Sequence, residues 1–524
     1  MTNYLANFSN SSNLQDGDET NNTNKTNETF NINNYLNYEK IKWHHKNQLF
    51  QSISKVFNIA SSANIKLYNP TFKLFTSKIY ENILYNNFNK LNYLIDENQG
   101  SINSVIKPLY IKKLSFIKDN YFLIDLFNNP KYNNSFEFYN LVENINSPAN
   151  VEIFISYLVS KLTELNICPS FNYLYSVINT SLPIFEYDLF MDEINHKKIK
   201  EKLDYLISNN KARIMFQNDS DGDSGGYSGD SDGDSDGDGD VESDDESDSD
   251  LESLNNKEFE IKSPQTESNN DNISDLLDNE SSHSDETTNC HFTLQLFDHP
   301  CYLLITEKNE YNLIQYLHTC VKNPNDFESR LKSIIFQVNS AIIIMYNYFK
   351  IKNNDLHVNN ILLVKTEQEF LYYKYGNKSY KIPTFGYIAK IIDWGRGTYE
   401  YNNIYGYNTI FNIPELEGFY NFNNIADTNK NMPHMFEYSD IALFAHNILN
   451  EFYLNDLKNI NIENYLYRLL ETKDGSNIDI MKFEWNIYVK IILLVKPYNK
   501  DYVLNEFFDE YIATDYDSEI VYFI

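Results

Sequence analysis

Apolar residues recur at helical spacing in two stretches of the chain. The first set is Val151, Phe154, Ile155, Leu158, Leu162 and Leu165, and the second is Leu331, Ile334, Ile335, Val338, Ala341, Ile342 and Met345. Residues three and four positions apart lie on the same face of an α-helix. The spacing therefore predicts an amphipathic helix over residues 151–165 and a long helix around residues 331–345.

Alternating, aromatic-rich stretches predict β-structure around these helices. Residues 108–127, PLYIKKLSFIKDNYFLIDLF, have the pattern of a hairpin that turns near residues 118–120. Residues 301–308, CYLLITEK, predict a short buried strand that a short helix follows. A second hairpin is expected in EFLYYKYGNKSYKIPTFGYIAKIIDWG, with its turn at Gly376 and Asn377. Helices and hairpins together predict an α+β fold.

Two polar stretches contain few apolar residues. Residues 1–35 are rich in Asn, Ser and Thr, and residues 217–288 hold 25 Asp and Glu against two Lys. Such segments cannot bury enough apolar surface to offset the entropy of ordering, so we expect both to be disordered. The second stretch carries −23 of the total charge of −31, which leaves the rest of the chain nearly ordinary. Its D-x-D-x-D-G register at residues 234–239 resembles a calcium loop, but no flanking helices are expected, and an acidic linker is the better interpretation.

Composition excludes several classes of protein. With 524 residues the chain exceeds one ordinary domain. No apolar run reaches the roughly 20 residues of a membrane span, and no basic surface with interleaved aromatic residues indicates nucleic-acid binding. The cysteines show no paired short spacing, which argues against a zinc site and a disulfide framework and favours an intracellular location. They are Cys168, Cys290, Cys301 and Cys320.

Two polar motifs follow the second predicted helix. NNDLHVNN contains Asp355 and, five positions later, Asn360, and IIDWG places Asp393 at the end of an apolar strand. Together they resemble the catalytic core of the protein-kinase-like superfamily. The resemblance implies a two-lobed fold in which Asp355 is the catalytic base, Asn360 and Asp393 bind Mg²⁺, and Trp394-Gly395 replaces the usual Phe-Gly. It also implies ATP as phosphoryl donor.

The motif departs from the protein-kinase consensus at three positions. Asn353 and Asn354 replace the His-Arg that precedes the base, so regulation by a phosphorylated activation loop is not expected. His357 stands where protein kinases usually have Lys, whereas aminoglycoside and choline kinases share the D-x-H sequence. A small-molecule substrate is therefore an alternative to a protein.

The spacing between Asn360 and Asp393 is about twenty residues longer than usual and contains the predicted second hairpin. Kinase-like proteins of giant DNA viruses of amoebae look similar, and a composition rich in Asn, Ile, Lys and Tyr suits such a source. For a viral protein of this kind we expect the host cytoplasm or the virion as its location.

Further residues take roles through the same resemblance. The strand at residues 301–308 resembles the one that leads into the hinge, where backbone groups of Thr306, Glu307 and Lys308 would bond adenine. Asp440, in YSDIALFAHNIL, would tie down the catalytic loop, and Gly395 would be structural. In the helix at residues 151–165, the candidate partners of the ATP-binding lysine are Glu152 and, as second choice, Glu164.

The lysine itself is hard to assign. Residues 36–215 contain only Gly100, so a Gly-rich phosphate loop cannot be drawn, and QGSINSV is at best a remnant of one. In the expected third strand, NYFLIDLF, Asp125 takes the place of the lysine and would repel phosphate. Lys112 or Lys113 on the preceding strand could substitute, because alternate strand residues share a face.

The sequence thus predicts a kinase-like protein with four parts. These are a disordered tail at 1–35, a helical extension at 36–100, a small lobe at 101–308 that contains the acidic insert 217–288, and a large lobe at 309–524. The predicted function is Mg²⁺–ATP-dependent phosphoryl transfer to a hydroxyl, with Ser or Thr of a protein substrate as the expected acceptor. The alternatives are an inactive or weakly active pseudokinase that serves as an interaction scaffold, and a small-molecule kinase.

Overall fold

A computed structural model describes the ordered elements of the chain. The described residues are 46–67, 90–116, 146–189, 197–216, 292–321, 324–401, 404–408, 438–455, 457–478, 490–491, 494–496, 499–513 and 520–524. The chain divides into two compact units, residues 1–48 and 49–524, and the elements below belong to the second. The predicted tail at 1–35 and the acidic insert at 217–288 lie outside the described residues.

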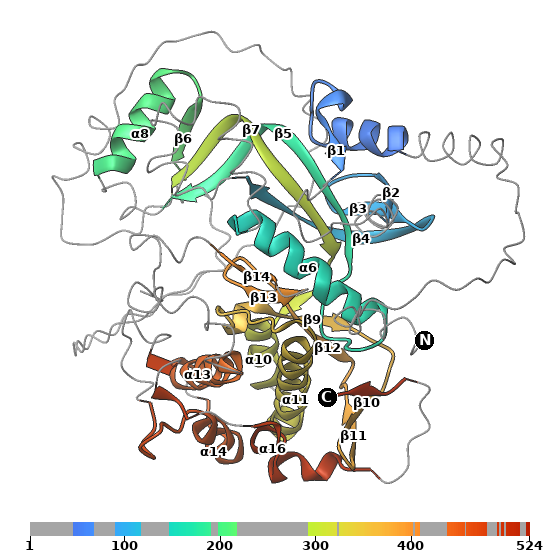
Figure 1. The fold of residues 1–524 in the computed structure, drawn as a ribbon, viewed down its shortest axis with the longest axis vertical. Coiled ribbons are helices and arrows are strands. Elements are labelled where there is room, and N and C mark those ends of the chain that lie inside the picture. The colour runs from blue at the N-terminus through green and yellow to red at the C-terminus, as the bar shows by residue number, and fades with distance from the viewer. Residues whose placement is uncertain are drawn as a thin grey trace, which may run out of the picture. The chain divides into compact units, whose positions relative to one another are not determined.

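A seven-stranded antiparallel sheet forms the first part of this unit (Figure 1). Its strands are β1 (Lys66–Leu67), β2 (Leu91–Leu94), β3 (Gln99–Ile102), β4 (Val105–Ser115), β5 (Leu174–Leu189), β6 (Ala212–Phe216) and β7 (Phe292–Glu307). The order is β1-β5-β7-β4-β3-β2, and β6 pairs with β7. Three strands separate β2 from β5 in this order, yet the N–H of Lys90, just before β2, donates to the carbonyl of Tyr175 in β5 at 2.6 Å. The sheet is therefore curled into a half-barrel.

Strands β2, β3 and β4 form a meander. β3 and β4 pair through a tight turn at Asn103 and Ser104, whose φ angles of 49° and 66° suit a two-residue hairpin turn. Gly100 is needed in β3 because a Cβ there would lie 2.7 Å from Cδ1 of Leu109. Residues 108–115 thus form a strand as predicted, but their hairpin partner precedes them in sequence. The predicted turn at 118–120 lies outside the described residues.

The meander also moves the start of the sheet. The boundary predicted at residue 100 cuts through β3, and β1 and β2 come from the segment predicted to be a helical extension. Within that segment, residues 49–56 are helical. The sequence did not predict β2 because the strand has only four residues, which is too short for a clear alternating pattern.

Helix α6 (Pro148–Glu164) connects the meander to β5 and matches the predicted helix within three residues. Pro148 occupies its first turn, where a missing N–H costs nothing. Its apolar residues at helical spacing are buried, among them Val151, Phe154 and Leu158. A further helix, α8 (Lys197–Ser208), lies between β5 and β6. Figure 1 shows β6 and α8 at the far end of the long β5 and β7 strands.

In the described residues from 308 onward, helices supply more residues than strands do, and we call this part the helical region. The helices are α10 (Leu313–Val321), α11 (Pro324–Phe349), α13 (Ser439–Leu454), α14 (Ile460–Leu469) and α16 (Lys500–Val503). The strands are β8 (Tyr311–Asn312), β9 (Ile361–Lys365), β10 (Phe370–Tyr375), β11 (Lys378–Pro383), β12 (Tyr387–Ile391), β13 (Thr398–Tyr401), β14 (Ile404–Tyr407) and β15 (Tyr522–Phe523). Short 3₁₀ turns cover Ser62–Asn64, Val358–Asn360 and Glu506–Tyr511.

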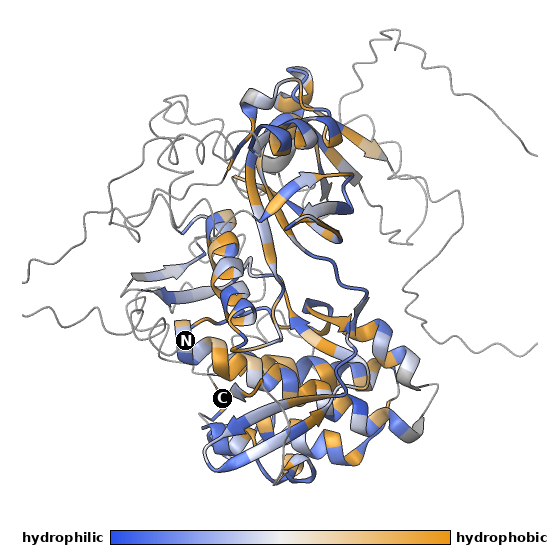
Figure 2. Ribbon diagram, turned by 90° about the vertical axis from the view of Figure 1, so that its right-hand side faces the viewer, coloured by the Kyte–Doolittle hydropathy of each residue, from blue (hydrophilic) through white to orange (hydrophobic). Residues whose placement is uncertain are grey.

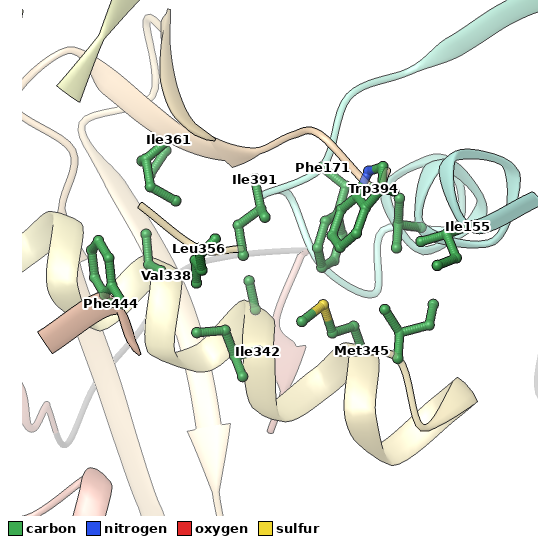
Figure 3. Packing of buried hydrophobic residues seen from close by; sticks show 14 of the residues in the cluster. Ile155, Phe171, Val338, Ile342, Met345, Leu356, Ile361, Ile391, Trp394 and Phe444 are labelled. Atoms are coloured by element: carbon green, nitrogen blue, oxygen red, sulfur yellow. The ribbon is translucent and has the colours of Figure 1, made fainter. Parts of the chain in front are cut away.

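The long predicted helix, α11, is the centre of the helical region. Every residue from 331 to 346 is buried, as expected for a helix surrounded by other elements. Figure 3 shows its residues Val338, Ile342 and Met345 packed near Leu356 and Ile391. The helices carry mixed apolar and polar stretches in Figure 2, in keeping with one inner and one outer face. Because α11 is buried from residue 331 to residue 346, the segment that follows it starts from a fixed position.

The second predicted hairpin is confirmed. β10 and β11 pair in register, with Tyr375 opposite Lys378 and the turn at Gly376 and Asn377. Gly376 has a φ of 56°, a conformation that glycine adopts without strain. β15, near the end of the chain, adds to β10 as a parallel strand.

Two contacts join the helical region to the sheet at the start of β5. The N–H of Ile391 in β12 donates to the carbonyl of Ser170 at 3.0 Å, and Nζ of Lys390 donates to the carbonyl of Phe171 at 2.9 Å. These bonds fix the end of β12, and hence the residues that follow it, against the sheet. The α+β class predicted from the sequence is confirmed. Within the described ranges, the structure contains no helix with the length and apolar character of a membrane span.

Candidate active site

The loop after α11 is held by one buried carboxylate. Oδ2 of Asp440 accepts the N–H of Asn353 at 2.6 Å, and Oδ1 accepts the N–H of Asn354 at 2.9 Å. Asp440 is in the first turn of α13 and fully buried. Burial raises the pKa of Asp440, although the two N–H donors and Lys352 offset part of that rise. The side chain thus bonds the loop backbone, the contact that the resemblance implies, and does not cap its own helix.

The two asparagines link this loop to the end of β12. Nδ2 of Asn353 donates to the carbonyls of Ile392 at 3.2 Å and Asp393 at 2.8 Å. Nδ2 of Asn354 donates to the carbonyl of Arg396 at 2.9 Å. Asn354 has a φ of 62°, a left-handed conformation that asparagine tolerates better than most residues. Asparagine at both positions therefore serves the backbone geometry of the loop.

Asp355 and Asn360 are fixed relative to each other. Nδ2 of Asn360 donates to the carbonyl of Asp355 at 2.8 Å, and the carbonyl of Asn360 accepts the N–H of Ile392 at 3.0 Å. Because its amide nitrogen is used in this way, Asn360 would offer its Oδ1 to a metal ion. The bond from the N–H of Ile392 to the carbonyl of Asn360 places Asn360 next to the residue that precedes Asp393.

Asp393 meets a lysine from the sheet, and the same lysine contacts a glutamate of α6. Nζ of Lys112 lies 2.6 Å from Oε1 of Glu152 and 3.3 Å from Oδ1 of Asp393. Asp393 keeps 42 % of its side-chain surface exposed, whereas Glu152 keeps only 7 %. Solvent can therefore reach the carboxylate of Asp393, whereas the buried carboxylate of Glu152 needs the charge of Lys112 to neutralise it.

The charges of this cluster stabilise one another. Burial opposes protonation of Lys112, but Glu152 and Asp393 more than offset it and raise the pKa of Lys112. Burial likewise opposes ionisation of Asp393, yet Lys112 and the N–H of Gly395 hold the pKa of Asp393 below its usual value. Lys112 is therefore a cation and Asp393 an anion at neutral pH.

The lysine comes from β4, the third strand of the meander. Lys112 pairs in register with Leu304 of β7 and faces α6. Asp125 lies outside the described residues. Lys113 points to the opposite side of the sheet, where it lies 3.3 Å from Glu97. Of the two lysines suggested by the sequence, the structure brings Lys112 to the site.

The two candidate glutamates of α6 contact different partners. Glu152 contacts Lys112, whereas Glu164, at the end of the helix, pairs with Lys161 at 2.7 Å and with Lys90. Three helical turns separate the two positions, so only one can reach β4. The first choice from the sequence is thus the one in the site.

The D-W-G turn packs tightly. Trp394 is buried against Phe171, with 6.1 Å between ring centroids, and Figure 3 shows Ile155 of α6 nearby. A Cβ on Gly395 would lie 3.2 Å from Oδ1 of Asp393 and 3.6 Å from Oε2 of Glu152. A side chain there would crowd the carboxylate of Asp393 and reach van der Waals contact with that of Glu152, which favours glycine at this position.

Of the three expected hinge residues, Thr306 and Glu307 lie in β7, and only Lys308 follows the strand. The N–H of Glu307 donates to the carbonyl of Tyr173 at 3.0 Å, and its Oε2 lies 3.3 Å from Nζ of Lys390. Thr306 is within the sheet, and Lys308 is the first residue after it. Glu307 is therefore already engaged, and Lys308 is the predicted hinge residue whose backbone lies outside the paired strands.

An exposed tyrosine lies between this segment and the lysine. Tyr110 is two residues before Lys112 on β4, so both side chains point to the same side of the sheet. It pairs in register with Thr306 and keeps 54 % of its surface exposed. The structure thus places an aromatic surface next to the predicted hinge.

The turn between β2 and β3, residues 95–98, contains no glycine. Its sequence is Ile-Asp-Glu-Asn, and Glu97 pairs with Lys113. The carbonyl of Asn98 accepts the N–H of Leu109 at 2.7 Å, which ties the turn to β4. Gly100, in the proposed remnant of a phosphate loop, lies instead inside β3.

Arg396 is a site residue that the sequence reasoning missed. Its Nε lies 3.5 Å from Oδ2 of Asp355. The available signal was its rarity, since the chain has four arginines, together with its place directly after D-W-G.

The arrangement has the chemistry of an oxygen-ligand site. Asn360 and Asp393 offer the hard oxygen atoms that Mg²⁺ prefers. Among the described residues, no group of three or more His, Cys, Asp and Glu is arranged to hold a metal ion. These two residues would therefore need further ligands from a substrate. No protein-family model matches the chain, and no curated protein is significantly similar to it.

Proposed function

We propose that this protein transfers the γ-phosphoryl group of ATP to a hydroxyl group in a Mg²⁺-dependent reaction, as a protein-kinase-like enzyme. The observation that carries the proposal is the meeting of Lys112, Glu152 and Asp393 from three separate elements. In protein kinases the corresponding lysine is on the third strand of the small lobe, its glutamate on the following helix, and the aspartate in the D-F-G sequence. Here the lysine is on the third strand of the meander, and α6 follows it.

The same proposal assigns the two-lobed fold. The curled sheet with α6 would be the small lobe, and the helical region would be the large lobe. Asp440 supports this assignment because it holds the loop backbone around Asp355 through two N–H bonds. A loop held in this way presents a carboxylate at a fixed position, which positioning of a substrate hydroxyl requires.

Each residue has a distinct task in the proposed reaction. Lys112 would neutralise phosphate oxygens while Glu152 fixes its position. Asn360 and Asp393 would hold Mg²⁺, which neutralises charge on the transferred group. Asp355 would orient the acceptor hydroxyl and take its proton. We favour a serine or threonine of a protein as acceptor; a small hydroxyl compound is the alternative, since His357 follows Asp355 at the position that suits both classes.

One observation favours a second candidate, a nucleotide-binding scaffold without transfer activity. The turn at residues 95–98 lacks glycine and carries Asp96 and Glu97. Acidic side chains close to a triphosphate would repel it, and backbone N–H groups of a glycine-rich loop would be missing. This candidate predicts nucleotide binding without turnover.

Incorporation of radiolabelled phosphate separates the two candidates. The full chain is incubated with Mg²⁺ and [γ-³²P]ATP and with mixed protein and small-molecule acceptors. We expect incorporation by the wild type and a fall of about 10³-fold or more for Asp355→Ala. Asp326→Ala on α11, an exposed residue in an ion pair with Arg330, is the matched control and should retain full activity. Equal incorporation by wild type and Asp355→Ala would remove Asp355 as the base.

A further inference from the structure

Arg396 brings a permanent positive charge to the proposed base. Its Nε lies 3.5 Å from Oδ2 of Asp355, and the two side chains keep 23 % and 25 % of their surface exposed. A guanidinium group stays charged at neutral pH and presents five N–H donors in one plane. The ion pair therefore places a cation rich in donors where an acceptor hydroxyl and a phosphoryl group would meet.

The backbone around Arg396 is held from both sides. Its carbonyl accepts Nδ2 of Asn354 at 2.9 Å, and the next N–H, of Gly397, donates to the carbonyl of Trp394 at 2.9 Å. One position further, Thr398 and Lys352 exchange two backbone bonds of 3.0 Å. The side chain thus starts from a rigid turn, which is the support that a functional group needs to keep its position.

The two cations of the site have different surroundings. Lys112 contacts the carboxylates of Glu152 and Asp393, on the side of the proposed metal ligands. Arg396 contacts Asp355, on the side of the proposed acceptor. Position 357, where the resemblance has a lysine, holds a histidine. Arg396 can therefore supply the positive charge that a lysine at that position would otherwise bring.

The contact between Arg396 and Asp355 is long for a charged hydrogen bond. Charge-assisted N–H···O bonds are typically about 2.7–2.9 Å, whereas this pair is separated by 3.5 Å. Both side chains keep about a quarter of their surface exposed, so solvent screens the pair in part. At this distance the two groups form an ion pair and not a charge-assisted hydrogen bond.

We propose that Arg396 is a catalytic residue that donates to the transferred phosphoryl group; this deepens the function proposed above and depends on it. In that step the acceptor oxygen forms a bond to the γ-phosphorus, and the bond to the bridging oxygen breaks. The electron pair leaves with ADP, and the hydroxyl proton passes to Asp355. The phosphoryl oxygens accept the guanidinium N–H groups of Arg396 as negative charge develops on them. An arginine supplied within the chain can stabilise such charge.

Three variants of the full chain test this role. Arg396→Ala removes the cation, Arg396→Lys keeps the charge without the planar donors, and Arg468→Ala is the control. Arg468 forms an exposed ion pair with Glu506 on another surface. Initial rates give kcat and KM, and calorimetry gives Kd for Mg²⁺–ADP and for Mg²⁺ with adenylyl imidodiphosphate, a non-hydrolysable ATP analogue.

We expect kcat of Arg396→Ala to fall by about 10²–10³-fold, while its Kd for Mg²⁺–ADP stays within about threefold of the wild type. The kcat of Arg396→Lys should lie between those of the wild type and Arg396→Ala. Millimolar propylguanidinium should restore part of the activity of Arg396→Ala but should not raise that of Arg396→Lys. A purely structural role would not respond to the added guanidinium compound. Arg468→Ala should match the wild type throughout.

The outcomes separate this inference from the proposed function. If the wild type transfers phosphate and Arg396→Ala does so equally well, the inference is wrong and the function stands. If the wild type transfers nothing but binds the ATP analogue more tightly than ADP, and Arg396→Ala loses that preference, the function and the catalytic role of Arg396 are wrong, and only its contact with the terminal phosphate stands. If the wild type shows neither transfer nor such a preference, both are wrong.

Discussion

The two sides of the candidate site are encoded in the sequence in different ways. On the loop side, Asp355 and Asn360 lie five positions apart and are joined directly, through a bond of 2.8 Å from the asparagine amide. On the sheet side, Lys112 meets Glu152, forty positions later, and no sequence motif surrounds either residue. The loop side is defined by local backbone geometry, and the sheet side by strand register.

This difference explains why one side is easier to recognise than the other. A loop that bonds to itself needs particular residues at several neighbouring positions, and these form a readable string. A strand lysine needs only to lie on the correct face of a correctly paired strand. Neighbouring Lys112 and Lys113 have the same chemistry, and only the register decides which of them reaches Asp393.

The strongest test of this contrast exchanges the two neighbouring lysines for methionine, one at a time. Lys112→Met should lower phosphotransfer by about 10²-fold or more, because a cation that stabilises phosphate charge is lost. It should also lower the free energy of unfolding by about 3 kcal/mol, since buried Glu152 loses its partner. Initial rates and urea unfolding measure the two effects.

Lys113→Met is the matched control. Its side chain pairs with exposed Glu97, so we expect a change within about 0.5 kcal/mol and an unchanged rate. The double variant Lys112→Met/Glu152→Leu should recover stability without activity, because an apolar pair can replace a buried ion pair. Equal damage from Lys113→Met would show that the register of β4 is wrong.

On the loop side, Asp440→Ala should have the next largest effect. It leaves the N–H groups of Asn353 and Asn354 without their carboxylate acceptor, and each buried unsatisfied group costs about 1–3 kcal/mol. We expect a loss of about 2 kcal/mol in unfolding free energy and a reduced kcat. Urea unfolding of this variant beside Asp326→Ala measures the difference, and equal stability of the two would contradict the anchoring role.

The sequence predicted those parts of the fold whose pattern is local. Helices α6 and α11 have long apolar repeats, and the β10–β11 turn has a glycine at the position that needs a positive φ. The β2–β3–β4 meander was missed because β2 is short and Gly100 suggested a loop rather than close packing on Leu109. β7 begins nine residues before the predicted strand, since its pairing with β5 continues where its own alternation is weak.

The same distinction applies to the candidate site. Asp355 and Asn360 are joined by a hydrogen bond, and Asp440 contacts the loop backbone, while the roles that the motif implies for these residues stay predictions. Arg396 and the cross-links from Asn353 could not be read from the sequence, because they depend on two loops that meet only in the folded chain. The assignment of Asp125 to the place of the lysine stays a prediction, because that residue lies outside the described residues.

On the sheet side, Tyr110→Ala tests whether the exposed aromatic surface contacts the base of a nucleotide. Stacking of a base on an aromatic side chain is worth about 1–3 kcal/mol, so we expect Kd for Mg²⁺–ATP to rise at least fivefold. Tyr110→Phe should bind as the wild type does, since its ring remains. Calorimetry gives both values, and tighter binding by Tyr110→Ala would mean that the tyrosine obstructs the site.

The smallest effect is expected for the acidic insert. Phe216 at the end of β6 pairs with Phe292 at the start of β7, so the ends of the intervening segment lie close together. Replacement of residues 217–288 by a short Gly-Ser linker should leave the unfolding free energy unchanged within about 1 kcal/mol, because closure entropy varies only with the logarithm of loop length. Loss of folding or of nucleotide binding would make the insert part of the fold.

A thermal-shift titration with Mg²⁺–ATP tests the central claim, that Lys112, Asn360 and Asp393 form a nucleotide site, most directly. At 100 times its Kd a ligand stabilises the folded state by about 2.7 kcal/mol, which gives a clear rise in Tm. We predict such a rise for the wild type, and its loss in Asp393→Asn, which keeps the shape of the side chain but not its charge. No rise for the wild type at millimolar Mg²⁺–ATP, or an equal rise for Asp393→Asn, would contradict the claim.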